Sequence, residues 1–514
     1  MAKQVRGVRA TCYPVWKFAF NQGAKAVREW NKLQTRLSIR MKAKKSKVAS
    51  APAIKPAAKL PVIHPHAGGI DVGSVEHYVC VPADAVKEGE SVVRSFGGFT
   101  AELDKLVEWL QSCDVRTVAM ESTGVYWIPL AQKLEAAGIE TVLANARHLR
   151  QVPGRKTDVK DCQWLQQLHS YGLIQGSFRP TQDICRVRSL MRHRQNLAQH
   201  CGQQVQHMQK ALQEMNVHLH HVVSDLNGQT GLRILDAILA GERAPEKLLE
   251  LRDQHCSKST AEEMAAALRG DWRAEHLFVL KQALETYRHL LKQMGDCEQE
   301  IQEALAQVMI PEAQPAAPPV PPNPPANPQP RKKKVFHHVK AGTGLQRDLS
   351  KELERLCGVD LTQVTGLNVL GVLIILSEIG LDMSRWRNAK AFVSWLGLCP
   401  GNKISGGKVL SSRTPHVANR VAIFLRMVGP AVGRTDTFLG FFHRRMRARL
   451  GPAGANTATA RKLACMIYHL LKYKEEFIDA DALFHQQRLL KRRVASLSRQ
   501  AEELGFELTK KPAA

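Results

Sequence analysis

The sequence of 514 residues lacks any long apolar run. The longest, around Leu370–Leu376, is far shorter than the ~20 residues that a membrane-spanning helix needs. The basic start of the chain has no apolar core followed by a small-residue cleavage site, so we expect no secretory signal. The eleven cysteines, an odd number, include no Cys-x-x-Cys pair. These absences argue against a membrane protein, a disulfide frame and a cysteine zinc site, and they predict a cytoplasmic protein with reduced thiols.

Acidic residues are also scarce. Only 47 Asp and Glu stand against 73 Lys and Arg, which gives a formal net charge of +26. Such an excess indicates a polyanionic partner, either nucleic acid or an anionic membrane surface. Two stretches concentrate the charge: residues 1–60 hold fifteen Lys or Arg and one acid, and Ser384–Leu450 holds thirteen and one acid. We interpret the second stretch as a nucleic-acid face; the first is either a phosphate-binding tail or an extension without a role.

The length exceeds what a single core supports, so two or three folded domains are expected. Shifts in composition predict six segments along the chain. They are a basic, largely disordered arm (1–65), a mixed α/β domain (66–180), a long helical or coiled-coil segment (181–310), a Pro-rich and basic linker (311–344), a mainly α domain (345–480) and a helical tail (481–514).

The helical segment and the linker have distinct signatures. Ile184–Val223 and Ser259–Ile310 contain few helix breakers and carry a narrow apolar stripe, which is typical of coiled coils. The stripe is equally consistent with packing inside one chain and with a dimer contact. Pro311–Pro330 contains ten prolines, which predicts an extended spacer between folded parts.

The α/β domain begins with short β-rich runs separated by turns, which predict an antiparallel meander, and continues with alternating helices and strands. The expected strands are Gly69–Ser74, His77–Pro82, Ser91–Phe99, Thr117–Glu121 and Glu140–Ala144, and the expected helices are Thr100–Gln111, Trp127–Ala137 and Asp158–Leu168. In a mixed sheet of this kind the first and fourth strands can lie side by side.

Four acids occupy consistent positions in this domain. Asp71 lies in the first strand, Glu121 ends the fourth, and Asp158 and Asp161 are one turn apart on the last helix. An acid in an apolar strand is costly unless something neutralises it. Carboxylate oxygens are the ligands that Mg²⁺ prefers, and paired metal ions assist attack at phosphorus. We therefore predict a Mg²⁺ site; the alternatives are a solvated acid pair on the helix and acids with a structural role only.

The C-terminal domain has a second candidate site at Ser405, which the sequence places in a loop. Gly406 and Gly407 allow a phosphate to approach the backbone, and Lys403 and Lys408 can neutralise it. Chemistry alone favours a serine that contacts a phosphate over a nucleophilic serine. Arg413 follows as a further basic contact in the predicted nucleic-acid-binding group.

Upstream, Val364–Gly371 followed by an apolar helix is similar to a helix-hairpin-helix, in which backbone amides approach a DNA phosphate. An ordinary helical hairpin is the alternative. Trp386, Phe392 and Trp395 recur at a spacing typical of a core, so we interpret them as packing residues.

The strings around the four acids, Ala67–Ser74, Val118–Gly124 and Lys156–Asp161, resemble those of the DEDD transposases of bacterial insertion sequences, the IS110 family. The string Gly397–Lys408 is similar to the signature of the C-terminal transposase domain of the same family, whose serine is nucleophilic. The two matches occur in the family's order and cover about Gly68 to Phe477. The chain departs from the family pattern at Ser411–Pro415, which leaves Ser411 and Ser412 as competing nucleophiles.

The resemblance implies a RuvC-like, ribonuclease-H-like fold and a recombinase that moves an insertion sequence. It also implies donor and target DNA and a structured guide RNA as partners, Mg²⁺ at the four acids, and a phosphoserine intermediate at Ser405. Strand exchange holds two DNA sites together, so a dimer or tetramer is expected. A Mg²⁺-dependent nuclease of the Holliday-junction type, without a covalent step, is the alternative. A nucleic-acid-binding protein without catalysis is a third reading.

Overall fold

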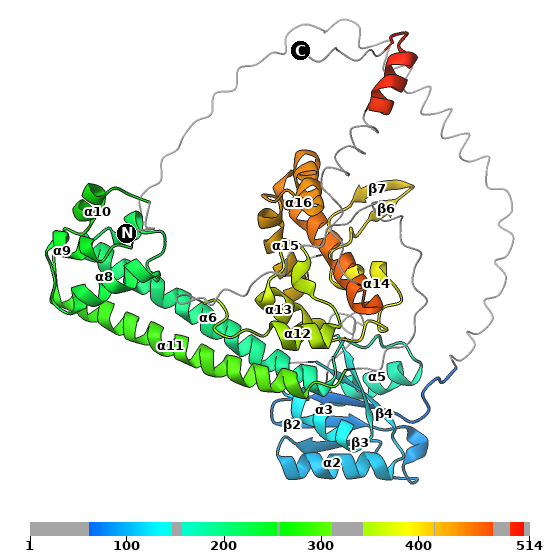
Figure 1. Ribbon diagram of the computed structural model, residues 1–514. Helices are drawn as coiled ribbons and strands as arrows, with labels where there is room; N and C mark the ends of the chain where they lie inside the picture. Colours follow the sequence, from blue (N-terminus) through cyan, green and yellow to red (C-terminus); the bar gives the residue numbers. More distant parts are fainter. Residues whose placement is uncertain are drawn as a thin grey trace, which may run out of the picture. The chain divides into compact units, whose positions relative to one another are not determined.

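The computed structural model describes residues 61–122, 124–145, 157–253, 258–310, 343–415, 417–475 and 494–507. Nearly all of the expected basic arm and of the Pro-rich linker therefore lies outside the described residues. The chain divides into two compact units, Met1–Phe178 and Arg179–Ala514, and each is described by itself (Figure 1).

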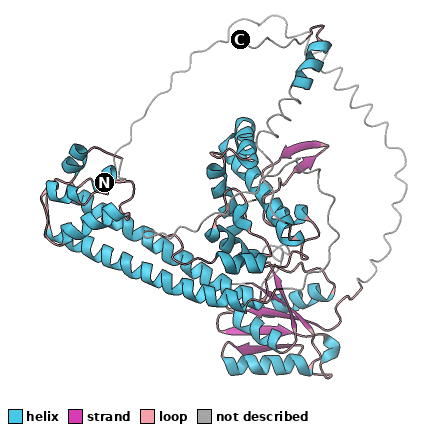
Figure 2. Ribbon diagram, in the orientation of Figure 1, coloured by secondary structure: helices cyan, strands magenta, loops and turns pink. Residues whose placement is uncertain are grey.

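The first unit is built on one mixed sheet of five strands, in the order β3-β2-β1-β4-β5. The strands are β1 (Ala67–Val72), β2 (Glu76–Cys80), β3 (Val93–Gly97), β4 (Thr117–Glu121) and β5 (Glu140–Ala144). Strands β1, β2 and β3 form an antiparallel meander, whereas β1, β4 and β5 run parallel. The predicted adjacency of the first and fourth strands is confirmed by the pairing of β1 with β4. Figure 2 shows the strands of the sheet in magenta.

Helices cover the two faces of this sheet. Helices α2 (Thr100–Ser112) and α3 (Trp127–Ala136) bury one face against a core that includes Ile70 and Met120. Helix α5 (Asp158–Ser170) packs on β1, β2 and β4 from the other face. A short 3-10 turn, Ala83–Ala85, follows β2. The unit is therefore a mixed α/β domain, as the sequence predicts.

The second unit is almost entirely helical and includes one hairpin of strands. Its labelled helices are α6 (Gln182–Glu214), α7 (Leu219–Val222), α8 (Gln229–Leu239), α9 (Pro245–Glu250), α10 (Ala261–Ala267), α11 (Ala274–Gln307), α12 (Ser350–Cys357), α13 (Val369–Ile379), α14 (Ala389–Trp395), α15 (Arg420–Val432) and α16 (Phe438–Tyr473), and a 3-10 turn covers Leu361–Gln363. A further helix covers residues 494–503. The hairpin consists of β6 (Lys403–Ser405) and β7 (Lys408–Ser411). None of the helices in the described ranges is long and apolar enough to cross a membrane.

The long helices α6 and α11 lie antiparallel and side by side (Figure 1). Residues near the start of α6 contact residues near the end of α11: Arg186 donates a hydrogen bond to Gln307. Further along α6, the Cys201 Sγ atom lies 3.8 Å from the Met294 Sδ atom, which is earlier on α11. The apolar stripes therefore meet within the chain, which is the intramolecular alternative of the sequence interpretation.

Two predicted helices are shorter in the structure. The helix expected over Ile184–Val223 ends at Glu214, and Asn216 follows with a left-handed φ of 58°. The run expected over Ser259–Ile310 is interrupted before α11. There Gly270 packs so closely that an added Cβ would lie 2.6 Å from the Met215 carbonyl oxygen. Tertiary packing at the end of the long pair breaks both helices.

A buried ion pair attaches the chain after the linker to the long helices. Arg194 on α6 donates to Glu298 on α11 at 2.8 Å, and the side chains are 2% and 0% exposed. Arg194 also donates to the carbonyl oxygens of Thr343 and Gly344. The Glu298 carboxylate accepts hydrogen bonds from the backbone N–H groups of Gln346 and Arg347. Every partner is thus hydrogen-bonded, as burial of charge requires.

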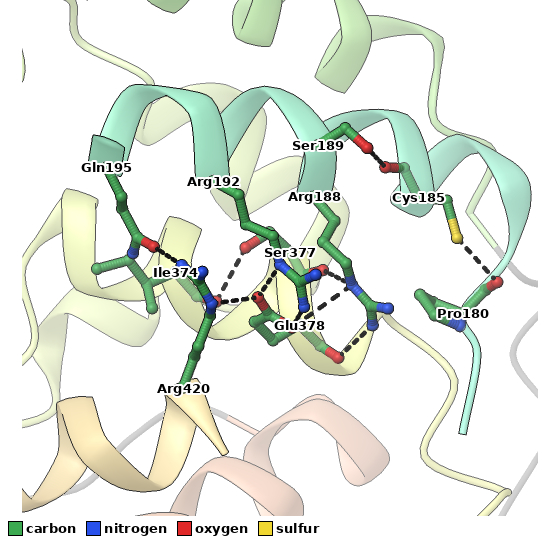
Figure 3. A network of polar contacts seen from close by, with 10 residues as sticks. All are labelled: Pro180, Cys185, Arg188, Ser189, Arg192, Gln195, Ile374, Ser377, Glu378 and Arg420. Carbon is green, nitrogen blue, oxygen red and sulfur yellow. Dashed lines mark hydrogen bonds and ion pairs between the residues drawn. The ribbon is translucent and has the colours of Figure 1, made fainter. Parts of the chain in front are cut away.

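A second network joins the helices of the C-terminal part to α6 (Figure 3). Glu378 on α13 accepts a two-fold hydrogen bond from Arg192, at 2.9 and 2.8 Å. Arg188 donates to the carbonyl oxygens of Ser377 and Glu378, and Arg420 on α15 lies 3.9 Å from the same carboxylate. Three arginines around one carboxylate therefore connect α6, α13 and α15.

The glycines of the expected helix-hairpin-helix serve packing. The amide of Gly371 donates to the Asn368 side chain at 2.8 Å, which caps α13, and Gly371 is buried. An added Cβ at Gly366 would lie 2.5 Å from Val428 on α15. These contacts favour an ordinary helical arrangement.

The aromatic trio also belongs to the core, as predicted. Trp386 and Phe392 are buried, their ring centroids lie 4.9 Å apart, and Trp395 packs 5.1 Å from Trp386.

We predict that Glu298→Ala lowers the free energy of unfolding of the second unit by about 3–5 kcal/mol, because it leaves the buried Arg194 without its counter-charge. The matched control is Asp236→Ala, which removes an exposed ion pair with Arg288 on the same helix α11 and should cost less than about 1 kcal/mol. Chemical denaturation followed by circular dichroism measures both. Equal losses in the two variants would contradict this account of the buried pair.

Candidate metal centre and candidate nucleophile

The two strand acids, Asp71 and Glu121, lie on one face of the sheet. Ile70 and Met120 are direct partners on the parallel strands β1 and β4, and the next residue on each strand is the acid. Ile70 and Met120 belong to the core beneath α2 and α3. Because side chains alternate along a strand, both acids face the opposite side, where α5 packs.

Helix α5 lies unusually close to β1 because Gly69 has no side chain. A Cβ at Gly69 would lie 2.3 Å from the Gln166 amide nitrogen and 2.4 Å from the Cys162 carbonyl oxygen. The Gln166 side chain also donates to the Ala67 carbonyl oxygen at 3.2 Å. The backbone of α5 thus packs directly on the backbone of β1, and this contact fixes the position of α5 over the strand.

The far end of α5 is held by a buried histidine. His169 shares a 2.9 Å hydrogen bond with Thr117 at the start of β4 and stacks on His64. Burial lowers the pKa of His169 to about 4, with a smaller contribution from His64, so the ring is neutral at pH 7. Sequence reasoning missed Gly69, Gln166 and His169. For Gly69 the sequence did offer a signal, a glycine close to the strand acid Asp71. For Gln166 and His169 it offered none.

These contacts define the direction of α5. Its last turn meets the start of β4 and its middle meets Gly69, so its first turn lies toward the strand ends that carry Asp71 and Glu121. Asp158 and Asp161 occupy that first turn, which the Thr157 hydroxyl caps. The structure therefore directs all four predicted acids to one end of one sheet face.

Electrostatic coupling agrees with this placement. Tyr78 is the strand partner of Asp71. Its pKa is raised first by its hydrogen bond to Glu76, with a further contribution from Asp158. The pKa of the Cys162 thiol on α5 is raised by its contact with Cys80 and by burial, and the Asp71 charge adds to the effect. The charge of Asp71 thus acts on Cys162, and the charge of Asp158 acts on Tyr78.

The side chains do not already enclose a metal. Within the described ranges, no group of three or more His, Cys, Asp or Glu is arranged to hold an ion. Asp158 is exposed, whereas Asp71, Glu121 and Asp161 are half-buried. The donor set consists of carboxylates alone, on one face and one end of the sheet, and this chemistry fits Mg²⁺. Lys156 and the rest of 146–156, which precede α5, lie outside the described residues.

The second candidate site is at the tip of the β6–β7 hairpin. The sequence predicts that Ser405 lies in a loop, and the structure corrects this. Ser405 is the last residue of strand β6, paired with β7 and immediately before the turn. Gly406 and Gly407 form that turn with φ of 54° and 77°, and nothing lies within 4 Å of a Cβ added at either. Two successive residues with positive φ are what a tight two-residue hairpin needs.

The ribbon places Ser405 beside its lysines. Lys408 is the cross-strand partner of Ser405, and Lys403 lies two residues away on the same strand face. All three are exposed, and so is Arg413. Of the competing serines, Ser411 is half-buried and accepts a long 3.4 Å bond from the Arg413 amide, while Ser412 follows the strand and is exposed. An open serine between two lysines can approach a phosphate.

Comparison with family models matches both parts of the chain. Residues 68–217, from β1 through α6, match the transposase model of the DEDD type of IS110. Residues 360–426, which include the hairpin, match the model described as transposase of the IS116/IS110/IS902 family. No curated protein matches the chain. The acid-bearing sheet and these matches define a DNA transposase, an enzyme that cuts and joins DNA. Both matches support an IS110-family transposase.

We predict that Gly69→Ala lowers DNA cleavage by about 100-fold, because α5 must move and carries Asp158 and Asp161 with it. The adjacent Gly68→Ala is the control, since its Cβ would meet mainly the Val115 side chain at 3.2 Å, and it should stay within a few-fold of wild type. Cleavage is measured on protein shown to be folded by circular dichroism. Wild-type cleavage in Gly69→Ala would refute the positioning role.

Proposed function

We propose that this transposase cuts and rejoins DNA through a phosphoserine intermediate assisted by Mg²⁺. The proposal is supported by the strand register and the helix direction, which bring four carboxylates toward one end of one sheet face, in a chain that also holds an exposed serine between two lysines. The strand order with parallel β1 and β4 supports a ribonuclease-H-like, RuvC-like domain.

Asp71, Glu121, Asp158 and Asp161 would hold the metal. Bound Mg²⁺ would neutralise charge on the scissile phosphate and favour in-line attack. The Ser405 oxygen forms a bond to phosphorus while one DNA oxygen leaves and takes up a proton, and the Ser405 proton passes to solvent. The bond energy is kept in the serine ester. Attack by a second DNA oxygen then releases Ser405 and joins the strands.

Lys403, Lys408 and Arg413, together with the open backbone of Gly406 and Gly407, would bind the phosphate that Ser405 attacks. The net charge of +26 supports a second polyanion besides DNA. We propose a structured guide RNA that the protein binds by shape and backbone, while base pairing reads the sequence. Joining two DNA sites calls for a dimer or tetramer.

The alternative is a Mg²⁺-dependent nuclease of the Holliday-junction type, which uses the same four acids and water. A nuclease has no use for a serine displayed on a glycine turn between lysines, so the hairpin favours the recombinase.

For the metal site, we predict that Asp71→Asn and Asp161→Asn each abolish DNA cleavage and leave folding and nucleic-acid binding intact, because a metal ligand is lost. Mg²⁺ should raise the melting temperature of the wild type and not of these variants, since an ion that binds only the folded state stabilises it. The control is Asp104→Asn, an acid of α2 that pairs with Lys133. Cleavage within a few-fold of wild type in either test variant would remove that acid from the site.

For the nucleophile, reaction with end-labelled DNA should leave label on the protein that resists denaturant and is released by protease. Ser405→Ala should lose both this adduct and recombination, and it should keep the Mg²⁺-dependent rise in melting temperature. Ser411→Ala and Ser412→Ala should retain the adduct.

Two other outcomes reassign the chemistry. An adduct that persists in Ser405→Ala and disappears in Ser411→Ala or Ser412→Ala moves the nucleophile along the ribbon. Cleavage without any adduct in the wild type supports the nuclease. Mixing Asp71→Asn with Ser405→Ala protein shows whether one protomer or two supply the groups, since recovered activity requires two.

A further inference from the structure

The β6–β7 hairpin has two chemically different faces. Ser405 and Lys408 are partners on one face, together with Lys403. The alternate pair, Ile404 and Val409, lies on the other face because successive side chains of a strand point to opposite sides. The register shifts next to this pair, and Leu410, which follows Val409, has no cross-strand partner in β6.

The apolar side chains of this ribbon are open to solvent. Ile404 is 62% exposed, Val409 57% and Leu410 70%. Ile404 and Val409 are cross-strand partners, and they form an apolar face that the described residues of the chain leave exposed. Figure 1 shows β6 and β7 as a ribbon beside the helices of the second unit, without a helix laid across it. Such a face indicates a partner.

Charge narrows the choice of partner. Between Asp382 and Asp436 the sequence contains nine Lys or Arg and no Asp or Glu. A second copy of this stretch carries the same positive charge and no acid to offset it, so charge does not favour a second copy as the partner of the ribbon. A polyanion is complementary to the same residues, and DNA is the partner of this enzyme.

DNA offers apolar surface mainly on the flat faces of its bases. In a closed duplex these faces are stacked on one another, and the outside presents phosphates and sugars. Where base pairs open, the faces become available, and apolar side chains can insert against them. Strand exchange requires such opening next to the cut.

We propose that Ile404 and Val409 dock against unpaired bases of DNA opened beside the phosphate that Ser405 attacks. The face with the lysines and the serine then contacts the phosphate of the opened DNA, and the aliphatic face contacts its unpaired bases. The inference rests on the proposed function for the role of Ser405, and it adds the DNA structure that the hairpin prefers.

The test compares binding of two DNA probes of the same sequence, a closed duplex and the duplex with a central bubble of unpaired bases. The full-length wild type should bind the bubble about tenfold more tightly, as burial of one or two aliphatic side chains allows. In the double variant Ile404→Thr/Val409→Thr the preference should fall below about threefold, with affinity for the closed duplex unchanged. Threonine is β-branched and preserves the strands.

The control is Phe278→Gln, which removes a 64% exposed apolar side chain of α11 and should keep the wild-type preference. Equal binding of both probes by the wild type overturns the inference, and so does a full preference in the double variant. A change in sedimentation of the DNA-free double variant would assign the face to a second copy. If the double variant keeps the bubble preference and loses affinity for a third probe, a single-stranded RNA, the face is assigned to RNA.

Failure of this inference is distinguishable from failure of the proposed chemistry. Ser405→Ala should keep the bubble preference, because the serine is on the other face of the ribbon. If the wild type prefers the bubble and forms no adduct, the docking face stands and the phosphoserine mechanism falls. If the adduct forms and the double variant binds both probes as the wild type does, the mechanism stands and the docking face falls.

Discussion

The contact between Gly69 and helix α5 is the constraint on which the candidate metal centre depends. Any side chain at Gly69 would collide with the backbone of α5, at 2.3 Å from the Gln166 nitrogen. The absence of a side chain allows the helix to lie directly on β1, and Gln166 and His169 hold it there. The four acids come from three elements, so their convergence depends on where α5 lies.

Glycines also determine the local structure of the hairpin, but there they form a turn and do not allow close packing. Gly406 and Gly407 have positive φ and turn the chain within two residues. No described atom lies within 4 Å of a Cβ added at either position. The tight turn sets the register, and the register separates Ser405 and Lys408 from Ile404 and Val409. A single short ribbon thereby presents a cationic face and an aliphatic face to whatever it binds.

Two networks of buried or half-buried charge connect helices of the second unit. Arg194 and Glu298 attach the chain that follows the linker to the α6–α11 pair, and Glu378 gathers arginines from α6 and α15 (Figure 3). Buried charged groups tolerate only geometries in which every partner is satisfied. We infer that these networks fix the helices behind the hairpin, so that the exposed ribbon extends from a rigid base.

The sequence by itself determined the local structure: strand and helix periodicity, the order of the elements, and the spacing that places Asp158 and Asp161 on one face of a helix. It also allowed the adjacency of β1 and β4, which the structure then established. These follow from neighbours in the chain and from the few ways a mixed sheet connects. The positions of the acids and of Ser405 were also named from the sequence, although their roles remain predictions. Only the tertiary structure decided that α6 ends at Glu214, that Gly366 and Gly371 serve helix packing, and that Ser405 ends a strand. It also decided that Gly69 meets Cys162, nearly a hundred residues along the chain. Such contacts depend on which surfaces pack together, and packing between distant segments leaves no periodic signal in a single sequence.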